Sequence, residues 1–297
     1  MSSIFTLSIV QSALELGFIY SLVALALFIS FTILNIADLS TDGCFTLGCA
    51  VGAMVTLAGH PVLALFAAMG AGVCSGFITA FLQTRMGIES ILAGIIVNTG
   101  LYTINIAVMG FASNVNLFGC DTIFSLAKET IGGSFYKIIV VAIVVAVIAL
   151  ILSWFLGTRL GLSIRATGNN PDMVKASSIN PGFMITVGLC VANSLTGLSG
   201  ALLAQYQKSC DINLGTGMVT IALASLIIGE SIIGKGSILK RVCGVVLGSC
   251  LYRFLVAVAI AFPYLKKRAA FSRQKSIAIR KRKEDSYAAA ETHRKDI

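Results

Sequence analysis

The chain has 297 residues, of which 57% are hydrophobic and only 12% are charged, and its formal net charge is +9. A soluble domain carries about 25% charged residues, and a chain of this length cannot bury so large an apolar fraction in one aqueous core. The composition therefore excludes a soluble enzyme, excludes disorder over residues 1–262, and predicts a membrane protein with several spans.

Apolar runs recur along the chain, and about 20 mostly apolar residues suffice to span a bilayer. We expect spans over residues 9–36, 62–82, 91–112, 138–156, 183–204 and 242–262. Two further runs, residues 44–59 and 218–228, are short. Because the second of these cannot cross alone, the predicted fold is an all-α, polytopic transmembrane helical bundle with broken or re-entrant helices, occupying residues 1–262.

Lys and Arg in short loops predict the orientation, because cytoplasmic loops carry an excess of them. The loop 157–182 holds Arg159, Arg165 and Lys175, and the turn 229–241 is also basic. The loop 113–136 is balanced in charge. We therefore expect the first two segments to be cytoplasmic, and the third segment and the N-terminus to be external.

Residues 263–297 form a second region, a basic tail with a net charge of +7. Such a segment next to a span predicts a cytoplasmic anchor on anionic lipid rather than a nucleic-acid site. One straight crossing of residues 242–262 would place this tail outside. We therefore expect a break or re-entrant turn near Arg253 to Ala259.

Polar residues close to the short runs are candidates for a translocation path, because interrupted helices commonly frame such paths. Asp38 and Asp42 precede the run 44–59. A solvated loop accounts for them equally well, and a buried amide such as Asn98 more often pairs across helices. The candidate path residues are Asn35, Asp38, Asp42, Asn98 and Glu230.

The stretch from Ser163 to Pro181 predicts a short capped helix. Asn170 is a good N-cap, Pro171 fits the first helical position, and Asp172 complements the positive helix start. We expect a helix from Pro171 to about Ser178. A polar two-turn helix between spans is either a docking element or an ordinary surface helix.

The other residue types that could bind a metal, catalyse a reaction or bind phosphate do not form the patterns that these functions need. With only two His and eight singly placed Cys, the sequence disfavours a zinc site and His-based acid/base catalysis. The segment from Gly229 to Gly236 nearly forms a phosphate-binding loop, but Gly236 replaces the required Ser or Thr, so we expect a turn. Cys120 and Cys210 both lie in loops that we place outside, and a disulfide between them is possible.

Four segments together resemble permeases of the branched-chain amino acid and ribose ABC importer family. They are IRATGNNPDMVKASSIN, LNIADLSTDGCFTLGCAVGA, ESILAGIIVNTGLYTINIAVMG and LIIGESIIGKGSILKRVCGVVLGSCLYRF. The resemblance covers nearly all of residues 10–258 and is strongest to permeases of amino-acid importers, some of them linked to tryptophan or tyrosine. Ser178 departs from the glycine that the family usually has there.

The resemblance implies a bacterial inner-membrane subunit that carries an amino acid or a related small polar solute and is not itself an enzyme. Its implied partners are a second permease copy, a cytoplasmic ATP-binding subunit, an extracytoplasmic substrate-binding protein and membrane lipid. ATP is implied to bind only to the partner, so no cofactor is expected here. The implied ATPase-coupling positions are Arg165, Thr167, Gly168, Asn170, Pro171, Asp172, Lys175 and Ala176.

Two other interpretations stay open. The first is a secondary transporter driven by an ion gradient through Asp38, Asp42 or Glu230. The second is an inactive permease, because the chain is shorter near its C-terminal end than the family pattern by about one span.

Overall fold

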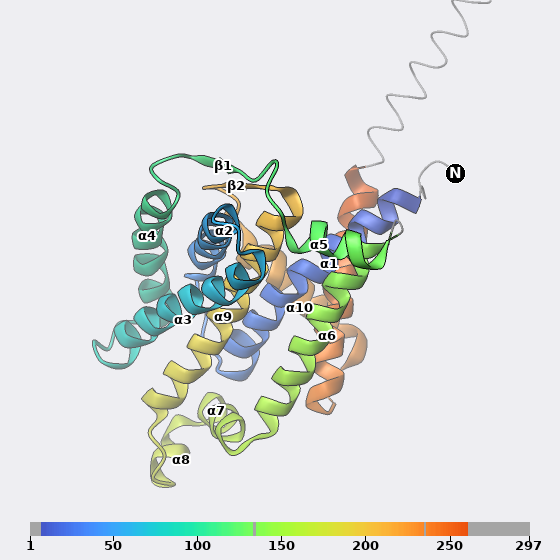
Figure 1. Ribbon diagram of the computed structural model, residues 1–297. Coiled ribbons are helices and arrows are strands. Elements are labelled where there is room, and N and C mark those ends of the chain that lie inside the picture. The colour runs from blue at the N-terminus through green and yellow to red at the C-terminus, as the bar shows by residue number, and fades with distance from the viewer. Residues whose placement is uncertain (1–6, 133–134, 235, 261–297) are drawn as a thin grey trace, which may run out of the picture. The chain divides into compact units, whose positions relative to one another are not determined.

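A computed structural model describes residues 7–132, 135–234 and 236–260 (Figure 1). The helices of the first half are α1 (Leu7–Leu27), the π-helix η1 (Phe28–Ile33), α2 (Thr41–Leu57), α3 (Pro61–Thr84), α4 (Ser90–Val108) and α5 (Ile123–Ile131). Those of the second half are α6 (Tyr136–Gly157), α7 (Arg159–Asn169), α8 (Pro171–Ala176), α9 (Pro181–Gln207), α10 (Met218–Ile233) and a final helix, Ile238–Ile260. Two short strands, β1 (Asn114–Asn116) and β2 (Ser209–Asp211), complete the described residues. The expected all-α bundle is confirmed.

Six helical segments of the described chain are long and apolar enough to cross a membrane. They are Ile9–Ile33, Pro61–Thr84, Ser90–Val108, Tyr136–Gly157, Pro181–Gln207 and Ile238–Ile260. Each overlaps one of the six predicted spans. The helices α2 and α10 have 17 and 16 residues, so neither reaches across a bilayer alone.

The helices α2, α3 and α9 form the centre of the compact unit Gln11–Arg253, which holds the candidate sites described below (Figure 1). Glycines allow these helices to approach closely. A Cβ placed on Gly48 would lie less than 3.0 Å from the backbone of Gly197, and one on Gly72 would clash in the same way with Asn193. Such small residues let backbones touch where lipid supplies no hydrophobic drive for association.

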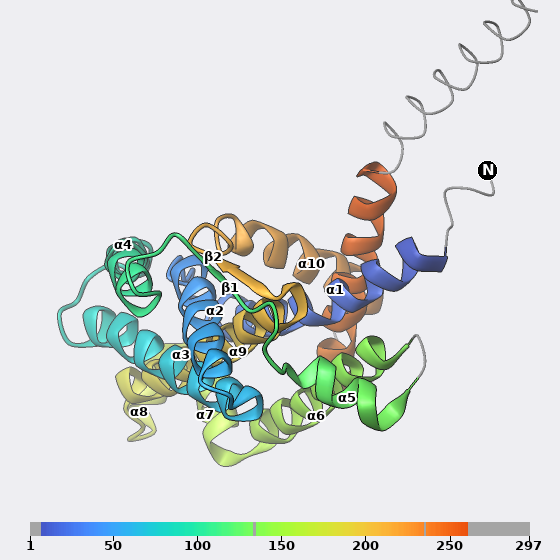
Figure 2. The ribbon, with the colours of Figure 1, turned by 45° about the horizontal axis from the view of Figure 1, so that its top comes forward.

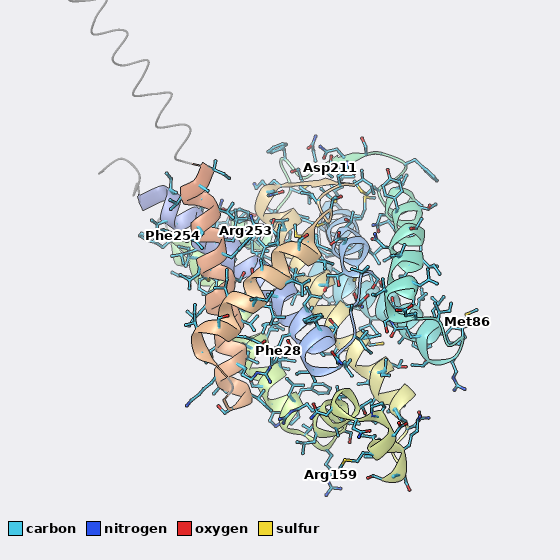
Figure 3. The ribbon with its side chains drawn as sticks, turned by 180° about the vertical axis from the view of Figure 1, so that it is seen from behind. Phe28, Met86, Arg159, Asp211, Arg253 and Phe254 are labelled. Atoms are coloured by element: carbon cyan, nitrogen blue, oxygen red, sulfur yellow. The ribbon has the colours of Figure 1, made fainter. Side chains whose placement is uncertain are left out.

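The two ends of this unit differ in structure. At one end β1 and β2 pair antiparallel, with Asn114 opposite Asp211 (Figure 2). At the opposite end lie α7 and α8, as the positions of Asp211 and Arg159 show in Figure 3. Because the basic loop contains α7 and α8, the positive-inside bias predicts that this end faces the cytoplasm, and this orientation stays a prediction.

The predicted break near Arg253 is wrong. Residues Ile238–Ile260 form one uninterrupted helix. The guanidinium of Arg253 lies 3.6 Å from the centroid of the Tyr20 ring, so a cation–π contact accommodates the charge without a break in the helix. The predicted cytoplasmic tail lies outside the described residues and stays a prediction.

The possible disulfide between Cys120 and Cys210 is not formed. Both are free thiols. Cys210 occupies the middle of β2, where the strand turns its side chain inward and buries it completely, whereas Cys120 is only half-buried. The alternation of side chains along β2 therefore directs Cys210 toward the core.

Candidate functional site

The segment between η1 and α2 is a break within the bundle. Asn35 has a left-handed backbone, with φ of 57°, a conformation that Asn adopts more readily than most residues. The Ile36 N–H donates to the Ser30 carbonyl oxygen at 2.8 Å, which closes the widened last turn of the helix. The chain then runs as an irregular segment to α2, so its polar groups need partners other than a helix ladder.

Asp38 supplies some of those partners. Its carboxylate accepts hydrogen bonds from the Ser40 N–H at 2.9 Å and the Ser40 hydroxyl at 2.6 Å. The Asn193 amide of α9 donates to its other oxygen at 2.9 Å. The residue is only 2% exposed. Asp38 therefore anchors the break to α9, and it does not lie on an open surface.

Asp42 joins the two short helices. It lies in the first turn of α2, and its carboxylate accepts from the backbone N–H groups of Gly217 at 3.0 Å and Val219 at 2.9 Å. These groups belong to the start of α10, so Asp42 caps a helix 175 residues further along the chain. The Thr46 hydroxyl accepts from the Gly215 N–H at 3.1 Å and strengthens the junction. The N-terminal ends of two short helices thus meet.

A groove of about 420 Å³ opens beside this junction. Asp42 and Thr46 contribute to one wall, the chain before α10 to another, and one face of α4 to the third. The lining residues are Asp42, Gly43, Thr46, Asn98, Thr99, Tyr102, Thr103, Asn105, Ile212, Asn213, Gly215 and Thr216. Eight of these twelve residues carry a hydroxyl or an amide group in the side chain, so the groove offers hydrogen-bonding partners to a polar solute.

The polar face of α4 was missed by sequence reasoning. Asn98, Thr99, Tyr102, Thr103 and Asn105 line the groove from this single helix. The Asn105 amide donates to the Gly43 carbonyl oxygen at 3.1 Å, while its own buried carbonyl oxygen has no partner. The spacing was visible in the sequence, because residues three and four positions apart share a helix face. Of these five residues, only Asn98 was predicted to line the path.

The structure brings Asp42 and Asn98 together in the groove, but not the other path candidates. Asn35 and Asp38 lie in the break, outside the groove lining. Glu230 lies at the far end of α10, where it forms an ion pair with Arg241 at 2.6 Å. In the part of the chain that the structure describes, no cluster of His, Cys, Asp or Glu could hold a metal ion.

The stretch from Ser163 to Pro181, named the coupling segment after its implied role, contains the expected capped helix. The Asn170 side chain accepts from the N–H groups of Asp172 and Met173, both at 3.1 Å, and Pro171 occupies the first turn. The helix ends at Ala176 rather than Ser178, because Ser178 has a left-handed φ of 60°. Asp172 and Lys175 pair at 3.2 Å on an exposed face.

Two of the implied coupling positions face inward instead. Thr167 is 4% exposed, and its hydroxyl donates to the Ser163 carbonyl oxygen at 2.8 Å. A Cβ placed on Gly168 would lie 2.9 Å from both the Ile33 carbonyl carbon and the Leu34 Cα. The helix α7, which composition did not predict, therefore packs against the end of η1, directly before the break at Asn35.

A buried carboxylate on α1 was not among the predicted site residues. Glu15 is 3% exposed and accepts hydrogen bonds from the Tyr206 hydroxyl at 2.7 Å and the Gln11 amide at 2.9 Å. The Lys137 ammonium lies 4.8 Å from the Tyr206 ring centroid. This cluster links α1 to α9. Tyr206 and Lys137 are distant from Glu15 in the sequence, so only the fold reveals their contact.

The comparisons with known proteins identify relatives. The family described as "Branched-chain amino acid transport system / permease component" matches residues 9–271. The chain is 32% identical over 255 residues to a tyrosine transport system permease protein of Clostridioides difficile. This match covers 86% of this chain and 84% of the relative. It is 30% identical to the D-allose transport system permease of Escherichia coli K12, over 70% of this chain and 63% of that one. It is 25% identical to the ribose import permease of the same strain, over 73% of this chain and 67% of the relative. No solved structure matches.

Proposed function

We propose that this chain, which belongs to the family of permease components of branched-chain amino acid transport systems, is the membrane-spanning subunit of an ABC importer for an amino acid or a related small polar solute. It lies in the inner membrane with several spans. A separate cytoplasmic subunit binds and hydrolyses ATP, and a substrate-binding protein delivers the solute from outside. The tyrosine transport permease among the relatives supports the amino-acid class.

One observation carries this proposal, namely the exposed polar face of a membrane-spanning helix. Thr99, Tyr102 and Thr103 of α4 are all exposed, Tyr102 by 51%. Polar side chains within a span rarely face lipid, and they usually face a water-filled cavity or another helix. We infer that a second copy of the chain covers the groove and that the two grooves together form the translocation path.

The coupling segment supports the use of a separate ATPase. Asp172, Met173 and Lys175 are exposed on α8, which suits the docking of a partner, while α7 packs on η1. A movement of α7 and α8 would therefore reach the break at Asn35, and through α2 the junction at Asp42. The ion-coupled alternative receives less support, because Asp38, Asp42 and Glu230 each already have hydrogen-bond or ionic partners.

Uptake by proteoliposomes tests the proposal. Vesicles would contain the permease and its ATP-binding subunit, with the binding protein outside, and labelled tyrosine and ribose would serve as probes. We expect uptake that requires enclosed ATP and survives an ionophore. Asn98→Leu should abolish it, whereas Ser153→Leu, on α6, should not. Uptake without ATP that an ionophore collapses would instead identify a secondary transporter.

A further inference from the structure

A second groove, of about 470 Å³, lies between the C-terminal end of α3 and the N-terminal end of α9. It shares no lining residue with the groove beside Asp42. Three aromatic rings form its apolar part, those of Phe77, Phe81 and Phe183, which are 54%, 47% and 56% exposed. The rings of Phe77 and Phe81 lie 6.4 Å apart, in a tilted pair on one face of α3.

The groove has a cationic end. Arg85 follows the last turn of α3 and lines the groove. The described ion pairs, Lys175–Asp172 and Arg241–Glu230, leave the Arg85 guanidinium without a carboxylate partner in the described part of the chain. A guanidinium presents several donors in a planar fork that matches phosphate oxygens. The cation therefore suits a phosphate group at this end.

The hydroxyl groups of this groove already donate hydrogen bonds to backbone carbonyl oxygens. Thr84 donates to the Ala80 carbonyl oxygen and Thr186 to the Gly182 carbonyl oxygen, both at 2.8 Å. The Asn180 side chain caps the Gly182 N–H at 3.0 Å. The Thr84 and Thr186 hydroxyl protons are therefore not available to a ligand. The rings of Phe77, Phe81 and Phe183 remain exposed beside them, and these rings suit an apolar chain.

The groove also lies at the right depth for a lipid. Both α3 and α9 are membrane spans, and a Cβ on Gly182 would lie 3.5 Å from the Thr84 Cβ, so their two ends are adjacent. The same end of α9 follows the coupling segment, which the positive-inside bias places in the cytoplasm. Arg85 therefore lies at the level of the inner-leaflet headgroups, and Phe77, about two turns earlier, lies deeper.

We propose that an anionic phospholipid of the inner leaflet occupies this groove, with its phosphate on Arg85 and one acyl chain along Phe77, Phe81 and Phe183. The charge of Arg85 and the order of cation, then rings, from the membrane surface inward match the order of headgroup and chain in the lipid. Basic pockets between spans on the cytoplasmic side are suited to anionic headgroups. The lipid would tie the end of α3 to the start of α9, next to the coupling segment.

Native mass spectrometry of the purified full-length chain tests this proposal, with phosphatidylglycerol and phosphatidylcholine as the two probes. We expect a retained phosphatidylglycerol molecule, and Arg85→Gln should weaken its retention about fivefold. Phe81→Ala should weaken the retention of both lipids. The matched controls are Lys240→Gln, which removes an exposed cation from the first turn of the helix Ile238–Ile260, and Phe66→Ala, which removes an exposed ring elsewhere on α3.

A second measurement separates lipid loss from misfolding. Added phosphatidylglycerol should raise the unfolding temperature of the wild-type chain and of Lys240→Gln, but not that of Arg85→Gln. Equal retention of phosphatidylglycerol by Arg85→Gln and the wild type would overturn the proposal. So would a loss of dimer in Phe81→Ala without any change in bound lipid, which would identify a second copy as the occupant.

Discussion

The contact between α7 and η1 makes a specific prediction for Gly168→Ala. A Cβ at this position would overlap the Ile33 carbonyl oxygen and would lie 2.9 Å from two backbone carbons of Ile33 and Leu34, whereas carbon atoms pack at about 3.5–4.0 Å. The backbone is not a flexible side-chain end, so α7 must retreat by more than the ~0.6 Å that the two carbon contacts alone require. Such overpacking costs about 1–3 kcal/mol, of which the helix propensity of Ala recovers up to ~1 kcal/mol.

The matched control is Gly157→Ala, because Gly157 is also helical but has nothing within 4 Å of the new Cβ. We expect Gly168→Ala to lower the unfolding temperature by several degrees, at about 2–4 °C per kcal/mol. Gly157→Ala should leave this temperature unchanged or raise it.

We expect Gly168→Ala to affect transport more than it affects stability. If α7 passes motion to the break at Asn35, the displaced contact lowers the amount of solute imported per ATP hydrolysed. The assay is simultaneous measurement of uptake and phosphate release in proteoliposomes with the ATP-binding subunit. If Gly168→Ala imports as much solute per ATP hydrolysed as the wild type, with ATPase docking intact, this glycine does not help to pass motion from α7 to the break at Asn35.

Three further predictions concern the other polar contacts. Asp42→Ala removes the cap of α10 and should destabilise the fold by about 1–2 kcal/mol. It should also reduce uptake more than Asp42→Asn does, and equal uptake by the two variants would contradict the role of the carboxylate. Asn193→Leu leaves the buried Asp38 carboxylate with Ser40 alone, so we expect a loss of about 1.5–3 kcal/mol, measured as a lower unfolding temperature. The double substitution Asp172→Lys and Lys175→Glu reverses two exposed charges and should abolish uptake. Membrane insertion, assayed by fractionation, should stay normal. Intact ATPase coupling would show that α8 does not dock through these charges.

Local patterns in the sequence predicted most of the helices. The apolar runs correspond to the six spans because a bilayer selects by length and hydropathy alone. The cap at Asn170 was predicted from a three-residue pattern, because capping is a contact between near neighbours. The helix α7 was missed, since its polar and glycine-rich sequence gains its order from packing on η1.

The geometry of the groove could not be predicted in the same way. Asp42 was a candidate from its position beside a short helix, but its partners are backbone groups of Gly217 and Val219, which carry no sequence signature. The break expected near Arg253 was wrong because a tertiary contact with the Tyr20 ring accommodates the charge. Residues far apart in the chain determine both outcomes.

Cross-linking between two copies tests the central claim most directly, namely that the polar groove is half of a path between them. Thr99→Cys would be compared with Val147→Cys, an exposed position on α6, in membranes treated with a short bifunctional thiol reagent and analysed by mass spectrometry to separate native cysteines. The account predicts that Thr99→Cys yields a dimer cross-linked through position 99 of both copies, and that Val147→Cys yields no such dimer. Efficient cross-linking through position 147 with none through position 99 would contradict it.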